Sequence, residues 1–275
     1  MVLDFSKKIY VMGILNVTPD SFSDGGDNFH VEGAVKRAKE MVKEGADIID
    51  IGGESSRPGA DPVSLEEELK RVIPVIERLS KEIDVPISID TYKSEVAKKA
   101  LEAGAHIIND ISGFKRDENM AKVAGEKNAY SILMHMRGNP KNMQENYHYG
   151  NIIKEIEEEL QESIDLALKN GLSRDKIILD PGIGFAKGIK ENVEVINNIE
   201  RLKEKFNLPI LIGASRKTFI GKILNIEEPK ERLEGSLAIA AISAYLGGNI
   251  LRVHDVRETK RVVEVANYLR MNKNL

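Results

Sequence analysis

Polar side chains of a few kinds stand at the ends of short apolar segments along this chain. Carboxylates and an asparagine amide can accept several hydrogen bonds from the N–H groups of one planar heterocycle, and a lysine can donate to the opposite edge. Arginine, histidine and a further amide oxygen suit an anionic group and a Mg²⁺ ion. The pattern therefore predicts a site for a ring that carries a phosphate. The residues concerned are Asn16, Arg57, Asp90, Asn109, Asp180, Lys217, Arg252 and His254.

Several of these polar positions also have a purely structural interpretation. Acidic residues and threonines after strands are often N-caps of the next helix, and we expect this of Thr91, Asp110 and Asp255. Asp180 suits it less, because Pro181 and Gly182 form a rigid turn well before the next helix.

Four other side chains have a structural alternative. Lys217 can be a solvated lysine at a helix start, although its place after an expected strand favours an inward role. We expect His135 to be a satisfied core histidine. Met134 and Met136 suit packing more than ligand contact, yet either can form the floor of a flat pocket.

Short apolar segments alternate with amphipathic ones along the whole chain, which predicts parallel strands joined by helical crossovers. The expected strands are 9–17, 46–53, 85–91, 105–113, 129–136, 176–182, 208–215 and 249–256. The expected helices are 31–45, 65–83, 93–104, 118–128, 152–171, 190–206, 229–248 and 257–271. Eight such units, with no linker between them, predict a single (β/α)8 TIM-barrel domain over residues 1–275. An open doubly wound sheet is the alternative, although its glycine-rich dinucleotide fingerprint is missing.

The links from strand to helix are much longer than those from helix to strand. The long ones span 18–30, 54–64 and 137–151. Loops of this length are usually functional, and in a TIM barrel they surround the active site. Because side chains alternate along a strand, we expect Ser88 and Asp90 to face the barrel axis while Ile87 and Ile89 face the helices. The same alternation turns Asp180 inward.

Composition excludes several classes of protein and site. The formal net charge of −4 argues against general nucleic-acid binding. The absence of cysteine excludes disulfides, thiolate metal sites and cysteine nucleophiles. No segment reads G-x-x-x-x-G-K-[ST], so side chains and loops are expected to contact the phosphate. With no apolar run of membrane-spanning length, we interpret the chain as a cytoplasmic protein without a membrane partner.

Eight motifs, in this order and at roughly this spacing, resemble the dihydropteroate synthase family of pterin-binding enzymes over essentially the whole chain. They are GILNVTPDSFSDGG, GGESSRPGA, ISIDT, NDISG, MHMRGNPKNMQ, DPGIGF, GASRK and RVHD. The resemblance implies condensation of 6-hydroxymethyl-7,8-dihydropterin pyrophosphate with p-aminobenzoate. The products are 7,8-dihydropteroate and pyrophosphate, in folate biosynthesis, and the family is the sulfonamide target. It also implies Mg²⁺ as cofactor and a homodimer, with the apolar segment 236–248 as a possible interface or a plain core helix.

The resemblance assigns roles residue by residue. The pterin set is Asp90, Asn109, Ile111, Met134, Asp180, Phe185, Gly213 and Lys217. The pyrophosphate set is Asn16, Arg57, Arg252 and His254, with Asn16 also the metal ligand. The p-aminobenzoate set is Phe22, Ser56, Pro58, Ser215 and Lys217, and the catalytic set is Asp90, Lys217, Arg252 and His254. Ser56 stands where threonine is common and Ile183 where phenylalanine is common, which puts only loop packing in doubt.

The resemblance and the residues together suggest how the reaction proceeds. Phe22, alone on a polar loop, is expected to close over the aromatic co-substrate. We expect dissociative, SN1-like substitution. Arg252, His254 and Mg²⁺ can neutralise the departing pyrophosphate, whereas no base is assigned to the arylamine.

Three other activities remain as alternatives. One is a pterin methyltransferase, which the SSRPG loop and the R-x-H-D end disfavour. The others are a Schiff-base lyase using Lys217 and a pterin-binding paralogue without turnover.

Overall fold

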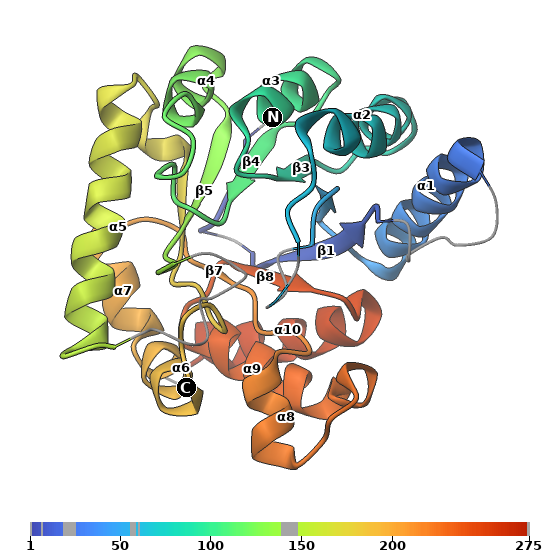
Figure 1. Cartoon of the computed structure of the whole chain (residues 1–275). Helices are drawn as coiled ribbons and strands as arrows, with labels where there is room; N and C mark the ends of the chain where they lie inside the picture. The colour runs from blue at the N-terminus through green and yellow to red at the C-terminus, as the bar shows by residue number, and fades with distance from the viewer. Residues whose placement is uncertain are drawn as a thin grey trace.

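The computed structural model describes residues 2–6, 8–18, 26–55, 59, 61–138 and 148–273. Figure 1 shows strands at the centre of the molecule with helices around them. The strands are β1 (Tyr10–Asn16), β2 (Ile48–Gly52), β3 (Ile87–Asp90), β4 (Ile107–Asp110), β5 (Tyr130–Met134), β6 (Ile177–Asp180), β7 (Leu211–Ile212) and β8 (Ile250–Val253). The helices are α1 (Gly26–Glu44), α2 (Leu65–Glu82), α3 (Ser94–Glu102), α4 (Met120–Lys127), α5 (Ile152–Lys169), α6 (Ile189–Asn197), α7 (Ile199–Phe206), α8 (Thr218–Leu224), α9 (Leu233–Tyr245) and α10 (Val256–Met271).

The eight strands pair in parallel in the order β6-β5-β4-β3-β2-β1-β8-β7, which leaves β6 and β7 at the two ends of the sheet. A parallel bridge between Leu179 and Ile210 joins these ends, and the Leu179 N–H donates to the Pro209 carbonyl at 2.9 Å. The sheet therefore curls into a nearly closed TIM barrel, as the sequence predicts, and is not an open doubly wound sheet.

The two faces of the strands form separate cores. Met12, Ile48, Ile107 and Ile178 belong to a cluster made almost entirely of strand residues, which fills the barrel. The alternate positions, Ile87 and Ile89 among them, belong to a larger cluster shared with the helices. The predicted alternation is confirmed, because period-two strands place one apolar set inside the barrel and the other under the helices.

Strand register brings the predicted polar residues to one end of the barrel. Asn16 of β1 pairs with Gly52 of β2, Gly52 pairs with Asp90 of β3, and Asp90 pairs with Asn109 of β4. On the other side, Met134 of β5 pairs with Asp180 of β6. These pairs lie at the carboxyl ends of the strands, where the strand-to-helix loops begin.

The helices differ from the sequence prediction in three places. The expected helix 190–206 is two helices, because the Asn198 amide donates to the Glu194 carbonyl at 2.8 Å and competes with the helical pattern. The expected helix 229–248 begins with a separate 3₁₀ turn, Pro229–Glu231. The short helix α8, directly after Lys217, was not expected. None of the helices in the described ranges is both long and apolar enough to cross a bilayer.

The expected N-caps are wrong in detail. The Asp110 carboxylate accepts from the N–H groups of Ser112 and Phe114, at 2.8 and 3.0 Å, and so caps the turn after β4 and no helix. Thr91 accepts at 3.2 Å from the N–H of Lys93, the residue directly before α3, and so does not cap the helix itself. Asp255 occupies the N-cap position of α10, but its side chain is engaged elsewhere.

The partner of Asp255 is Arg216, whose Nε donates to it at 3.0 Å. This ion pair ties the start of α10 to the loop after β7. Arg216 and Asp255 directly follow Ser215 and His254 in the chain. Their ion pair therefore holds these two residues together at the mouth of the barrel.

Candidate active site

The centre of the barrel mouth is an ion network around Arg252. Arg252 leaves β8 and donates from Nε to Asp50 at 2.6 Å and from Nη2 to Asp90 at 2.5 Å. Burial opposes the charge, but the two carboxylates raise the pKa of Arg252 above its ordinary value. The guanidinium therefore stays charged and lies across the mouth from β8 to β2 and β3.

Asp50 is a functional residue that the sequence reasoning missed. It is fully buried, and besides Arg252 its carboxylate accepts from the Asn109 amide at 3.0 Å. A charged group between isoleucines in an expected strand was the available signal, since buried carboxylates need partners. Asp50 fixes both Arg252 and Asn109, so it orients two of the predicted side chains from beneath.

Gly52 leaves room for two polar groups above it. A Cβ atom at Gly52 would lie 3.7 Å from Asp90 Oδ2 and 3.9 Å from Asn16 Oδ1. The amide oxygen of Asn16 and the Asp90 carboxylate therefore face the same space over β2. Burial, with the negative charge of Asp50 adding to it and Arg252 opposing, raises the pKa of Asp90 to about 7.

A second carboxylate and a lysine lie on the other side of the mouth. Asp180 is 6% exposed, and one of its oxygens accepts from the Gly182 N–H at 2.7 Å. Burial raises the pKa of Asp180. Burial also lowers the pKa of Lys217 to about 7, with Asp180 opposing that shift. The Lys217 amine stands 3.9 Å from the centroid of the Phe185 ring, a cation–π contact.

A small apolar cluster lies between these polar groups. Ile111, Met134 and Phe185 pack together, and Tyr92 and Met136 contact them from the side. Flat hydrophobic side chains with acceptors at one edge and a donor at the other suit a planar heterocycle. Gly213 lies beside Arg252: a Cβ atom at Gly213 would be in van der Waals contact with Arg252 Cβ, at 3.8 Å.

His254 is held in one orientation by Ser215. The backbone N–H of His254 donates to Ser215 Oγ at 3.3 Å, and that oxygen lies 3.1 Å from His254 Nδ1. These two contacts fix the orientation of the imidazole ring, with Nε2 on the side away from Ser215.

Four predicted residues, Phe22, Ser56, Arg57 and Pro58, lie outside the described residues. Glu54, two residues before Ser56, is held by bonds to two side chains. The amine of Lys93 bonds the carboxylates of Glu54 and Glu68, each at 2.5 Å, and Tyr92 donates to Glu54 at 2.8 Å. Sequence reasoning missed this cluster, because nothing in the sequence pairs residues so far apart in the chain.

Within the described ranges, no three acidic or histidine side chains converge as an all-protein metal site. Mg²⁺ usually keeps several waters and takes one or two protein ligands together with substrate phosphates. A single amide oxygen at the mouth, that of Asn16, fits this second kind of site.

Comparison with known proteins agrees with the geometry. Residues 12–254 match the family model described as pterin binding enzyme. The dihydropteroate synthase of a Synechocystis strain is 49% identical over 268 residues, which cover 98% of this chain and 92% of that protein. The Bacillus subtilis enzyme is 48% identical, over 98% of this chain and 92% of its own length.

Solved structures show the same relationship. A dihydropteroate synthase from Clostridium difficile, solved in the presence of pteroic acid, has a TM-score of 0.92 at 46% identity. The alignment covers 98% of this chain and 99% of that one. The chain belongs to the dihydropteroate synthase family. It is therefore a transferase of folate biosynthesis, as the sequence resemblance implies.

A second structure of the family, from Yersinia pestis with a sulfonamide drug complex, has a TM-score of 0.91 at 43% identity and covers 98% of this chain and 96% of its own. The activity is inferred from membership of the family, and the contacts described above are observed in the structure of this chain.

Asp50→Asn should destabilise the protein. The change keeps the side-chain volume but removes a buried negative charge beside Arg252. Removing one partner of a buried ion pair costs roughly 3–5 kcal/mol. Asn109 and Asp90 also bond this network, so we expect the lower part of that range in denaturant unfolding. The exposed residue Asp165 provides a control, Asp165→Asn, which should leave the midpoint unchanged. An Asp50→Asn protein of wild-type stability would contradict the account of this network.

Proposed function

We propose that the barrel mouth holds the pterin ring of 6-hydroxymethyl-7,8-dihydropterin pyrophosphate on the apolar cluster. The observation that carries this proposal is the arrangement of the buried Asp180 carboxylate, the partly exposed Asp90 carboxylate and the Asn109 amide around Ile111, Met134 and Phe185. Asp180 accepts from the ring N–H and the exocyclic amine, and Lys217 donates to the opposite edge. The orienting contacts from Asp50 and Gly182 hold these acceptors before the ring arrives.

The pyrophosphate lies against Arg252 and His254, with Arg57 added from the segment after β2. Arg252 presents a charged guanidinium, and His254 presents an imidazole ring that Ser215 orients. Asn16 would hold Mg²⁺, which supplies charge neutralisation for the leaving group when bound.

The p-aminobenzoate ring occupies the outer side of the mouth, near Ser215 and Lys217. The family resemblance also assigns Phe22, Ser56 and Pro58 to this ring, and these three lie outside the described residues. One solved relative supports p-aminobenzoate as a ligand. A Xanthomonas albilineans dihydropteroate synthase, 41% identical with a TM-score of 0.90, was solved with 4-aminobenzoic acid.

The substitution is dissociative. The bond between the exocyclic carbon and the bridging oxygen breaks first, and its electron pair leaves with pyrophosphate, which Arg252 and His254 neutralise. The dihydropterin ring shares the positive charge left on carbon, and ionised Asp90 stabilises it through preorganised electrostatics. The arylamine nitrogen then forms the C–N bond and loses a proton to water. No side chain in the described ranges is assigned as a base for the arylamine.

Asp180→Asn should weaken pterin binding. The variant keeps the size of the side chain but sets an N–H donor against ring donors. An unpaired buried polar group costs roughly 1–3 kcal/mol, and 1.4 kcal/mol is about tenfold in affinity. Calorimetry with 6-carboxypterin should therefore show at least about a tenfold loss. Unchanged affinity would remove Asp180 from the ring site.

Isotope scrambling tests the order of bond changes. With p-aminobenzoate absent, substrate carrying ¹⁸O in the bridging position should scramble its label on the enzyme, because pyrophosphate leaves reversibly. Asp90→Asn should slow scrambling and turnover together, since both pass through the same cation. A label that stays in place while turnover proceeds normally would indicate direct displacement by the arylamine.

We also propose a homodimer formed through α9 and α10, which pack on each other along one side of the barrel. Several apolar side chains there face solvent: Ile242 is 45% exposed, Val265 62% and Leu269 58%. They line one groove together with Tyr245. Exposed apolar patches of this kind mark interaction surfaces, and the dimer implied by the family resemblance names a second copy as the occupant.

Val265→Glu combined with Leu269→Glu should convert the dimer to monomer, because a carboxylate on each copy would be buried without a partner. Light scattering after gel filtration measures the change in mass. Ile223→Glu, an equally exposed apolar position on α8, is the matched control and should leave the dimer intact. A wild-type protein that is already monomeric would refute the interface.

A further inference from the structure

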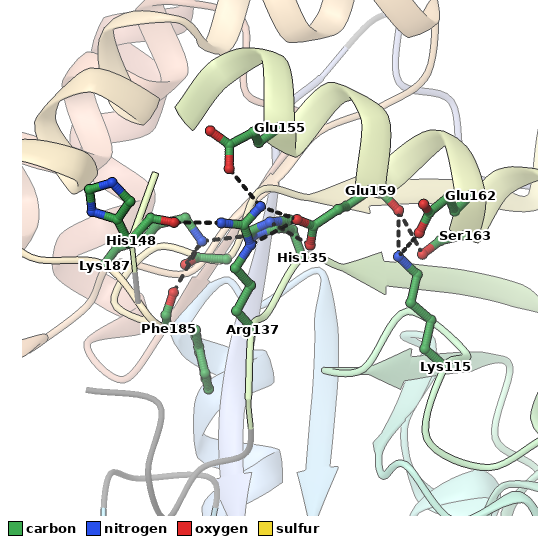
Figure 2. Close-up of polar contacts among 11 residues, drawn as sticks. Lys115, His135, Arg137, His148, Glu155, Glu159, Glu162, Ser163, Phe185 and Lys187 are labelled. Carbon is green, nitrogen blue, oxygen red and sulfur yellow. Dashed lines mark hydrogen bonds and ion pairs between the residues drawn. The ribbon is translucent and has the colours of Figure 1, made fainter. Parts of the chain in front are cut away.

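A buried lysine that none of the roles above uses lies behind the apolar floor of the site. Lys187 is 2% exposed, and its amine donates to the carbonyl oxygens of Gly182 and Phe185, each at 3.1 Å. The same nitrogen lies 2.9 Å from Nδ1 of His135 (Figure 2). A buried amine with three close contacts is a built feature, because burying an ammonium is costly without acceptors.

The protonation of this cluster follows from the Lys187 contact. Burial lowers the pKa of His135 to about 4, so the ring is neutral and carries one proton. A charged Lys187 amine has only N–H groups to offer, so Nδ1 accepts from it and the ring proton lies on Nε2. One oxygen of Glu159 on α5 lies 3.2 Å from Nε2, at ion-pair distance but without hydrogen-bond geometry. Burial opposes ionisation of Glu159, yet contacts from His135 and Arg137 lower its pKa to about 2.

The three N–H bonds of a charged Lys187 then match three acceptors: two carbonyls and His135 Nδ1. Burial lowers the pKa of Lys187 to about 7, and Asp180 opposes the shift. Glu159 also forms an ion pair with Arg137, which in turn bonds Glu155 at 2.7 Å. Both glutamates would therefore keep Arg137 as their partner if Lys187 lost its charge.

The loop that Lys187 holds has an unusual backbone. Gly182 and Gly184 have positive φ angles of 71° and 82°, and Ala186, which has a Cβ, has 47°. Left-handed conformations cost energy for residues other than glycine, so this loop keeps its shape only where contacts enforce it. Lys187 bonds the loop at two carbonyls and thereby enforces that shape.

The same loop contacts both polar edges of the ring site. The Gly182 N–H donates to Asp180, and Phe185 lies under the Lys217 amine. Gly184 approaches Lys217 so closely that a Cβ atom there would lie 2.6 Å from Lys217 Cδ. A shift of the loop would therefore move the acceptor, the donor and the floor of the site together.

We propose that Lys187, held through His135 by Glu159, is a positioning residue for the pterin site. It contacts neither ring nor pyrophosphate, and it sets the loop 181–187 that orients Asp180, Phe185 and Lys217. This inference rests on the pterin site proposed above. Its physical basis is that supporting contacts must hold a binding constellation to a fraction of an ångström.

Lys187→Met tests the inference, because methionine keeps an unbranched chain only one atom shorter and removes all three donors. We expect 6-carboxypterin affinity to fall by about tenfold or more, since a binding site must be held to about 0.5 Å for its contacts to form. Lys190→Met, an exposed neighbour, should bind as wild type does. Ile164→Val, a core change farther along α5, shows what a stability loss alone does to affinity.

The outcomes separate the two proposals. Wild-type protein that fails to bind the pterin refutes the site itself. Wild type that binds, with Lys187→Met binding equally well, refutes the positioning role alone. A loss of affinity in Lys187→Met no larger than in an equally destabilised Ile164→Val protein also refutes it.

A second pair of variants decides the matter if Lys187→Met does not fold. Asparagine places an amide oxygen where His135 has Nδ1, so His135→Asn keeps an acceptor for Lys187 while His135→Leu removes it. We expect His135→Asn to bind the pterin more tightly than His135→Leu. Equal affinity in the two variants would overturn the inference.

Discussion

The charge of Arg252 at the centre of the barrel mouth is the constraint around which the site is organised. A buried guanidinium is costly unless carboxylates surround it, and here Asp50 and Asp90 do so from two neighbouring strands. The arrangement requires β8, the last strand in the chain, to pair with β1, because this pairing brings Arg252 close to β2 and β3. Fold and site are therefore coupled through one side chain.

The network also explains why the mouth is strongly polar yet ordered. Asp50 bonds Arg252 and Asn109, so a residue outside the predicted ligand set fixes two predicted ones. Lys187 plays a comparable part on the other side, where it fixes the loop after Asp180. In both places a buried charge bonds backbone or side-chain partners and in turn sets the position of a group that faces the ligand.

Much of this could be predicted from the sequence, because it depends on local periodicity. Alternation along 85–91 placed Asp90 inward. The number of units favoured a barrel over an open sheet, and the bridge between Leu179 and Ile210 decides between them.

What could not be predicted depends on contacts between residues distant in the chain. The sequence gives no sign that Asp50 meets Arg252 or that Lys187 meets His135, since each pair is brought together only when the barrel folds. Local competition by side chains was also missed. Asn198 divides one expected helix into two, and Asp255 pairs with Arg216 instead of capping α10.

A crystal structure with 6-hydroxymethyl-7,8-dihydropterin pyrophosphate and Mg²⁺ tests the central claim most directly. The account predicts the ring between Asp180 and Lys217 on the Phe185 floor, with the pyrophosphate against Arg252 and His254. Arg252 should keep its bond from Nε to Asp50 in that complex. A ring bound outside this mouth, or a pyrophosphate that leaves Arg252 untouched, would contradict it.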